Sequence, residues 1–277
     1  MSRRTNTPKH GPPRRKRPLP TPQNIANIYV DYEIKRVVVI TKDILLNQLR
    51  REMPLIAASF DEITIDELQQ VSELIAATYG ILSPRLIGRD LTDQNLAPTC
   101  ARLLYSAATT FTGCVQLARS GFPRQYMMLN RSVVETVSSV LRLTIDAKAL
   151  REFYNGKFNS SKTIHAAKQV LPVFGPLYGM LSNQFVHIGE GHSQIEKIGR
   201  YSKDDEALSV ILINMKITAW LIYVATELVF RASVPAPRYW KVLTRHPEGD
   251  EVMYAPSEAE KEWQAGFFGW SAENPEY

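Results

Sequence analysis

Two apolar segments joined by a very short turn constrain the fold of this chain more than any other feature. Residues 100–120 and 123–145 repeat apolar side chains at helical spacing. Gly121 stands just beyond the first segment, where helices often end on a left-handed residue. Pro123 suits the first turn of the next helix. So short a connection predicts that the two helices pack as an antiparallel pair.

Most of the remaining chain also has helical patterns. Thr64 and Glu67 have the spacing of a capping box, which predicts the start of a helix there. That helix should run to about residue 79, because Gly80 and Pro84 follow. Further segments are predicted as helices at 147–157, 161–171, 176–188 and from the acidic residues 204–206 to Phe230, with a Gly-rich polar loop at 189–203.

Residues 23–53 fit two interpretations. Ile25, Ile28 and Tyr32 would share one face of a helix. Residues 37–41 are a β-branched run, which is typical of a strand. We predict a helix here, because the sequence shows no evident partner for such a strand.

The predicted fold class is all-α, with one helical bundle as its centre. A chain of 277 residues with 44% hydrophobic content can bury a substantial core. We place the bundle at 24–231, a disordered basic tail at 1–23, and a Pro/Trp-rich extension that packs on the bundle at 232–277.

The basic character of the chain belongs to the tail. Residues 1–23 hold seven Lys and Arg residues and no acid, so the rest has a net charge of −2 against +5 for the whole chain. Three interpretations of the tail stay open. It could bind nucleic acid through phosphates, dock into a groove in polyproline form, or be a solvated extension.

Several features indicate a reduced, cytoplasmic protein. Cys100 and Cys114 would lie about 21 Å apart along one helix, too far for a disulfide. The N-terminus lacks the apolar stretch of a signal peptide. Residues 208–230 are long enough to cross a bilayer, but Lys216 and Glu227 within them favour a central bundle helix. We therefore expect no membrane insertion.

Two helical faces carry more polar residues than a plain core helix needs. On the helix at 123–145, Arg131 and Glu135 stack one turn apart, in a stripe that also holds Arg124, Met128, Ser138 and Arg142. The pair could be an ordinary surface pair, or an Arg held ready for an anion such as phosphate. On the helix at 204–230, one face holds Lys216, Trp220, Tyr223 and Glu227, which could edge the same cluster or reach solvent.

A second polar signature surrounds His187. Ser182 and Asn183 precede it by about one turn, and Glu190 and His192 follow in the loop. His187, Glu190 and His192 could ligate a metal in principle, but their spacing matches no recognised zinc motif. Because no P-loop, dinucleotide-binding motif or nucleophile elbow occurs either, we predict neither a metal nor another cofactor.

The block from 103 to 192 resembles a group of uncharacterised bacterial helical proteins. These carry an Arg-x3-Glu helix followed by a Tyr-x3-Ser-x4-His segment, matched here by Arg131, Glu135, Tyr178, Ser182 and His187. The group is similar in turn to the HEPN superfamily of α-helical bundles, many of which are ribonucleases in toxin–antitoxin and antiphage defence systems. The usual HEPN motif has an Arg four to six residues before the His on one helix. This chain has Ser182 there instead.

The resemblance implies a cytoplasmic defence or toxin protein that binds or cleaves RNA without a metal. In that hypothesis His187 is the general acid–base, Arg131 held by Glu135 meets the phosphate, and Tyr178, Ser182, Asn183 and His192 contact the substrate. The alternative is a noncatalytic interaction module, in which the same cluster only fixes packing. The partners left open are RNA, a second copy of the chain and another protein.

Overall fold

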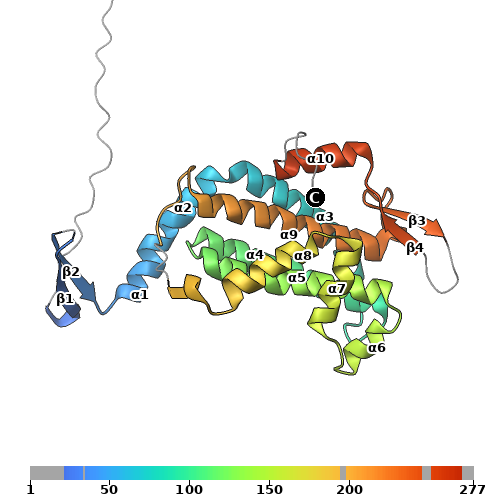
Figure 1. Cartoon of the computed structure of the whole chain (residues 1–277), viewed down its shortest axis with the longest axis horizontal. Coiled ribbons are helices and arrows are strands. Elements are labelled where there is room, and N and C mark those ends of the chain that lie inside the picture. The colour runs from blue at the N-terminus through green and yellow to red at the C-terminus, as the bar shows by residue number, and fades with distance from the viewer. Residues whose placement is uncertain (1–21, 34, 194–197, 245–250, 270–277) are drawn as a thin grey trace, which may run out of the picture. The chain divides into compact units, whose positions relative to one another are not determined.

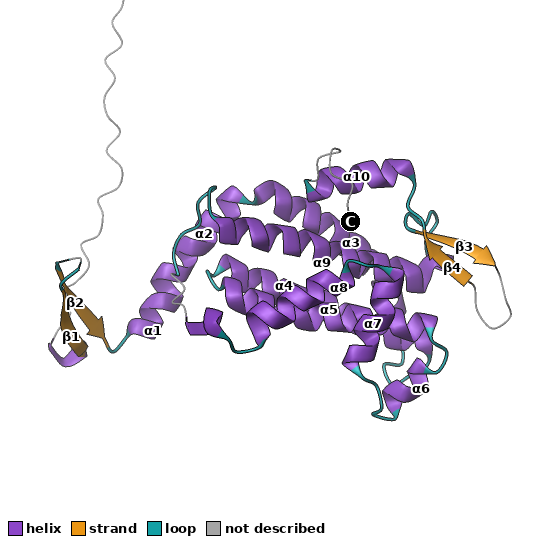
Figure 2. Ribbon diagram, viewed as in Figure 1, coloured by secondary structure: helices purple, strands orange, loops and turns teal. Residues whose placement is uncertain are grey.

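The computed structural model describes residues 22–33, 35–193, 198–244 and 251–269. Helices make up 69% and strands 9% of the structure (Figure 2). The chain divides into two compact units, 1–53 and 54–277. Nearly all of the tail predicted to be disordered, 1–21, lies outside the described residues. The fold class is therefore mostly α, and two small sheets correct the all-α prediction.

The first unit holds a β-hairpin where we predicted a helix. Strand β1 (Ile25–Asp31) pairs antiparallel with β2 (Arg36–Thr41), and Ile28 stands opposite Val39 in their register. The helix prediction was thus wrong for 25–41. The β-branched run forms a strand because its partner is the segment that we had assigned to a helical face. A short helix, α1 (Ile44–Asn47), and a π-helical turn at Gln48–Glu52 follow.

Long helices dominate the second unit (Figure 1). These are α2 (Met53–Ile63), α3 (Ile65–Leu86), α4 (Leu96–Arg119), α5 (Pro123–Ile145) and α9 (Glu206–Phe230). Helix α4 packs against α3, α5 and α9, and α9 also packs against α3 and α5. The core lies among these helices and includes both cysteines.

The turn between α4 and α5 has the predicted form. Gly121 adopts a φ of 83°, as expected of a glycine that follows a helix end. A Cβ atom there would lie 3.1 Å from side-chain atoms of both Ile56 and Ile198. Glycine is therefore favoured at this position by backbone conformation, and any side chain there would have to displace the two isoleucine side chains.

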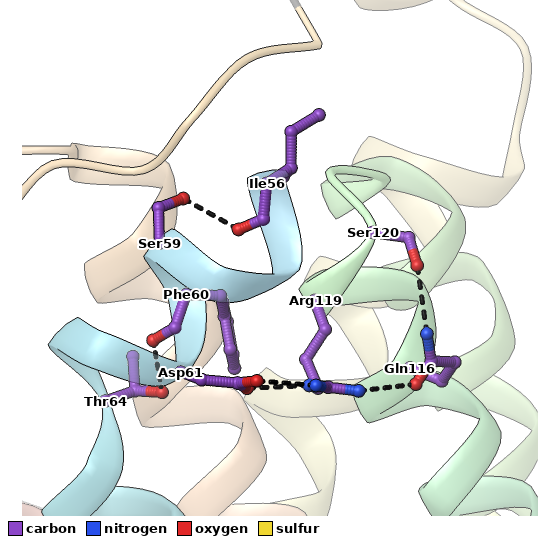
Figure 3. Close-up of polar contacts among 8 residues, drawn as sticks. All are labelled: Ile56, Ser59, Phe60, Asp61, Thr64, Gln116, Arg119 and Ser120. Atoms are coloured by element: carbon purple, nitrogen blue, oxygen red, sulfur yellow. Dashed lines mark hydrogen bonds and ion pairs between the residues drawn. The ribbon is translucent and has the colours of Figure 1, made fainter. Parts of the chain in front are cut away.

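The junction between α2 and α3 differs from the predicted capping box. The Thr64 hydroxyl donates to the Phe60 carbonyl over 2.9 Å and makes no cap bond, so it continues the preceding helix (Figure 3). Helix α3 also extends past Gly80 and contains Pro84. Alongside, the Arg119 guanidinium holds the Asp61 carboxylate with bonds of 2.7 and 2.5 Å, which ties α2 to α4 (Figure 3).

Shorter helices cover α5. They are α6 (Ala149–Tyr154), α7 (Ser160–Val170) and α8 (Phe174–Met180), which continues as a π-helical segment at Leu181–Val186. Helices α7 and α8 and the π-helical segment all contact α5. The predicted loop that follows contains a 3-10 turn at Glu190–Ser193.

The C-terminal segment forms a hairpin and a helix. Strand β3 (Trp240–Thr244) pairs antiparallel with β4 (Glu251–Tyr254), and helix α10 (Glu258–Phe268) contacts α9. The Trp240 indole donates to the Val224 carbonyl of α9 over 2.9 Å. Among the described residues, 206–233 alone is long and apolar enough to cross a membrane, and 61% of its most apolar stretch is buried inside the protein.

Candidate functional site

The structure brings three of the predicted site residues into contact. Arg131 Nη2 lies 3.0 Å from Glu135 Oε1 and donates to the Tyr178 hydroxyl over 2.9 Å. Tyr178 in turn donates to Glu135 Oε1 over 3.0 Å. These three side chains, from α5 and α8, are called the Arg131 cluster below. Their contacts close a triangle between the two helices.

The Arg131 cluster is half-buried at the protein surface. The side chains of Arg131 and Glu135 are 23% and 29% exposed. Burial disfavours the charged Arg131, but the hydrogen bond with Tyr178 and the charge of Glu135 outweigh it and raise its pKa. Its guanidinium also lies 5.2 Å from the centre of the Tyr178 ring. Arg131 is therefore a fixed cation with part of its surface open to solvent.

Ser182 lies one turn beyond Tyr178 and is buried, with 6% exposure. Its hydroxyl has no hydrogen-bond partner among the described residues, and the same is true of the buried Nε of Arg131. Asn183, the next residue, is exposed. Of these two predicted substrate contacts, only Asn183 presents its side chain to solvent.

His187 lies outside the Arg131 cluster. It ends the π-helical segment, where its backbone N–H donates to the Ser182 carbonyl over 3.0 Å and its ring is exposed. Nine residues separate it from Tyr178, roughly 13 Å along a helix. Tyr178 lies in α8, and His187 ends the π-helical segment that follows it. Among the described residues, the His187 side chain therefore makes no hydrogen bond or ion pair with the Arg131 cluster.

His192 has a positioning contact instead. Its Nε2 lies 3.1 Å from the Phe185 carbonyl, and the Gly189 backbone N–H donates to its Nδ1 over 3.3 Å. An Nδ1 that accepts implies that Nε2 carries the hydrogen and donates. The ring thus fastens the loop onto the end of the π-helical segment. Among the described residues, no group of three His, Cys, Asp or Glu side chains is arranged to hold a metal ion.

Two other residues of the stripe on α5, Ser138 and Arg142, contact side chains of neighbouring helices. The Ser138 hydroxyl donates to the Glu135 carbonyl over 2.8 Å. Arg142 is buried, pairs with Glu152 of α6, and lies 4.8 Å from the Phe158 ring centre. This arginine holds α6 rather than extending the Arg131 cluster.

A second polar cluster was not predicted as a unit. Arg238 donates to both Glu260 oxygens over 2.7 and 2.6 Å, and the Tyr239 hydroxyl donates to Glu260 over 2.5 Å. The Tyr239 backbone N–H donates to the fully buried Glu227 carboxylate over 2.7 Å. We call Glu227, Arg238, Tyr239 and Glu260 the C-terminal cluster. Its partners lie far apart in sequence, so spacing alone could not reveal it.

The predicted face of α9 belongs to this C-terminal cluster. The rings of Trp220 and Tyr223 pack edge-on against Tyr239, and Lys216 Nζ lies 5.6 Å from the centre of the Phe267 ring. The face therefore receives the C-terminal segment and does not edge the Arg131 cluster. Burial raises the pKa of Glu227, although hydrogen bonds from the backbone around Tyr239 oppose the shift.

A cavity of about 580 Å³ opens where the start of α5, the end of the π-helical segment and the start of α9 meet. Met127 and Phe185 stand in its walls, one turn from Arg131 and Ser182 respectively. The seam that carries the Arg131 cluster thus leads toward a space large enough for a small ligand.

No protein-family model, no curated protein and no solved structure matches this chain.

Proposed function

We propose that this chain is a HEPN-like helical protein of a bacterial defence or toxin system that acts on RNA in the cytoplasm, as a metal-independent ribonuclease. In this proposal α3, α4, α5 and α9 form one bundle that carries the site. The observation that carries the proposal is the Arg131 cluster, because a half-buried arginine fixed by Glu135 and Tyr178 is prepared to meet a phosphate.

The proposed chemistry needs a proton acceptor that solvent and substrate can reach. His187 is an exposed imidazole at the end of the π-helical extension of α8, the helix that carries Tyr178. It would accept the proton of a ribose 2′-hydroxyl as that oxygen attacks the adjacent phosphorus. The bond from phosphorus to the 5′-oxygen breaks as the 5′-oxygen takes a proton from water, and a 2′,3′-cyclic phosphate remains. His187 then returns the proton that it accepted to solvent.

Arg131 would bind a negatively charged phosphate of the same RNA strand. Arg131 lies on α5 and contacts Tyr178 of α8, whereas His187 ends the π-helical extension of α8. An RNA strand that reaches both residues would therefore meet Arg131 at one phosphate and His187 at another. The exposed Asn183 lies between Tyr178 and His187 along the chain and would position the strand. Ser182, buried below, would support that segment.

The decisive experiment replaces His187 by Ala and compares the variant with His165→Ala, a change of another exposed histidine, on α7. We expect His187→Ala to abolish RNA cleavage, or toxicity on expression, while thermal stability stays near that of the wild type. His165→Ala should retain both activities. Undiminished cleavage by folded His187→Ala would remove this residue from the mechanism.

One observation favours the alternative, a noncatalytic interaction module. The hairpin of the first unit has an apolar face with Ile28, Val30, Val37 and Val39 exposed by 39–64%. A two-stranded hairpin with such a face gains stability from a partner. If wild-type protein cleaves no RNA in a broad panel, and Val37→Lys disrupts self-association measured by light scattering, the interaction module is the better description.

A further inference from the structure

The cavity at the start of α9 has walls of two chemical kinds. Met127, Phe185, Val210 and Ile211 supply an apolar surface. The charged residues around it are Arg124, Arg200, Asp205 and Glu206. The cavity therefore offers apolar packing together with both cations and carboxylates, which suits neither a simple anion nor a purely apolar ligand.

The wall formed by Tyr201 is held in place from three sides. Its hydroxyl donates to the Ala118 carbonyl over 2.6 Å. Its backbone N–H donates to the Ser59 hydroxyl over 3.0 Å. The ring packs edge-on against Phe60, with 5.3 Å between the centres. This part of the cavity is thus preformed, as in most small-ligand sites.

Two further residues of the lining, Asp205 and Phe185, are also anchored. Asp205 caps α9 by accepting from the Ala207 backbone N–H over 3.0 Å. Phe185 is tied to the following loop, because its carbonyl lies 3.1 Å from His192 Nε2. His187 follows Phe185 by two residues, within about 7 Å along the backbone.

We propose that this cavity binds one unstacked nucleobase of an RNA strand together with its phosphate. A base is planar and apolar on its faces, which fits packing against Phe185 and its apolar neighbours. Its edge carries amino and imino groups, which would donate hydrogen bonds to the carboxylate of Asp205 or Glu206. The attached phosphate matches the guanidinium of the exposed Arg200.

This inference rests on the proposed action on RNA, and it deepens that proposal in one respect. A strand whose base is held beside Phe185 leaves the cavity next to His187, the proposed acid–base. Recognition of a single unpaired base would then select where the strand is cut.

The test titrates the full chain with AMP, CMP, GMP and UMP by calorimetry. Two tryptophan variants of α9 form a matched pair. Val210 is 42% exposed and lines the cavity, whereas Ile213 is 49% exposed and does not. We expect saturable binding of at least one nucleotide, its loss in Val210→Trp, and its retention in Ile213→Trp. Arg200→Ala should weaken binding of that nucleotide more than binding of its nucleoside.

Two outcomes would overturn the inference: no saturable binding of any of the four nucleotides, or equal binding by Val210→Trp and the wild type. RNA cleavage measured in parallel separates the two proposals. Cleavage by wild type that Val210→Trp leaves unchanged would reject the base site and keep the ribonuclease. Nucleotide binding lost in Val210→Trp, without any cleavage by wild type, would keep the site and reject the ribonuclease.

Discussion

Tyr178 donates its hydroxyl hydrogen to Glu135 across 3.0 Å, and so joins α8 to the helix that carries Arg131. The same hydroxyl accepts from Arg131. Tyr178 is therefore both donor and acceptor within one ionic cluster. Because hydrogen bonds in such a network strengthen one another, the three side chains should act together.

Replacing Tyr178 by Phe tests this coupling. We expect Tyr178→Phe to lower the free energy of unfolding by about 1 kcal/mol, the usual value of one hydrogen bond, and somewhat more if Glu135 loses support. Urea denaturation of Tyr178→Phe, Glu135→Gln and the double variant gives the coupling energy. The control is Tyr105→Phe, since that tyrosine is 49% exposed. Equal losses in Tyr178→Phe and Tyr105→Phe would show that the cluster adds nothing to stability.

A pair of glycines separates backbone strain from crowding. Gly121 and Gly156 have φ values of 83° and 67°, so alanine costs about 1–2 kcal/mol at either position. Only Gly121 has neighbours at 3.1 Å, and overpacking there should add about 1–3 kcal/mol. We therefore expect Gly121→Ala to unfold at a lower temperature than Gly156→Ala in a calorimetric scan. The reverse order would mean that Ile56 and Ile198 move aside freely.

Local signals explain which parts of the fold could be predicted. Helices α4 and α5 and the turn at Gly121 follow from periodicity and from one glycine, all within a short stretch of sequence. The hairpin of β1 and β2 was missed because a strand needs a partner, and the helical spacing of Ile25 and Ile28 masked that partner. Similarly, the bond of Thr64 to Phe60 could not be told from a cap by spacing.

The candidate site shows the same limit. The pairing of Arg131 with Glu135 is a one-turn contact, and the sequence predicted it. Tyr178 was also named, but only through the family resemblance, since no helical spacing relates it to Arg131. The bonds of Arg238 to Glu260 join residues brought together by a hairpin, and nothing in the sequence around either residue indicates them.

The two cysteines should not react with thiol reagents in the folded protein. Both are fully buried, and burial raises the pKa of each thiol to about 12. The reactive thiolate is therefore scarce, and reagent cannot reach the sulfur. At pH 8 we expect an aromatic disulfide reagent to label neither Cys100 nor Cys114 until denaturant is added, when both react. Rapid labelling of native protein would contradict the burial of α4.

Glu227 should make stability depend on pH. Its carboxyl group is buried, and burial raises its pKa above the ordinary value of 4.5. The folded state therefore holds this proton more tightly than the unfolded state. The bound proton makes its whole contribution to the free energy of unfolding below pH 4.5. This contribution is lost as the pH rises from 4.5 through the raised pKa of the folded state.

The variant Glu227→Gln isolates this effect, because its amide stays uncharged and keeps an oxygen to accept from the Tyr239 N–H. We expect the stability of the variant relative to wild type to increase as the pH rises through 4.5 to the raised pKa of Glu227, and to level off above that pKa. Urea denaturation at several pH values measures the difference. Glu258→Gln is the control, since the side chain of Glu258 is 84% exposed and should give no such trend. The prediction would be contradicted if the stability of Glu227→Gln relative to wild type fell as the pH rises. In that case Arg238 and the surrounding backbone N–H groups would stabilise the Glu227 carboxylate more than burial destabilises it.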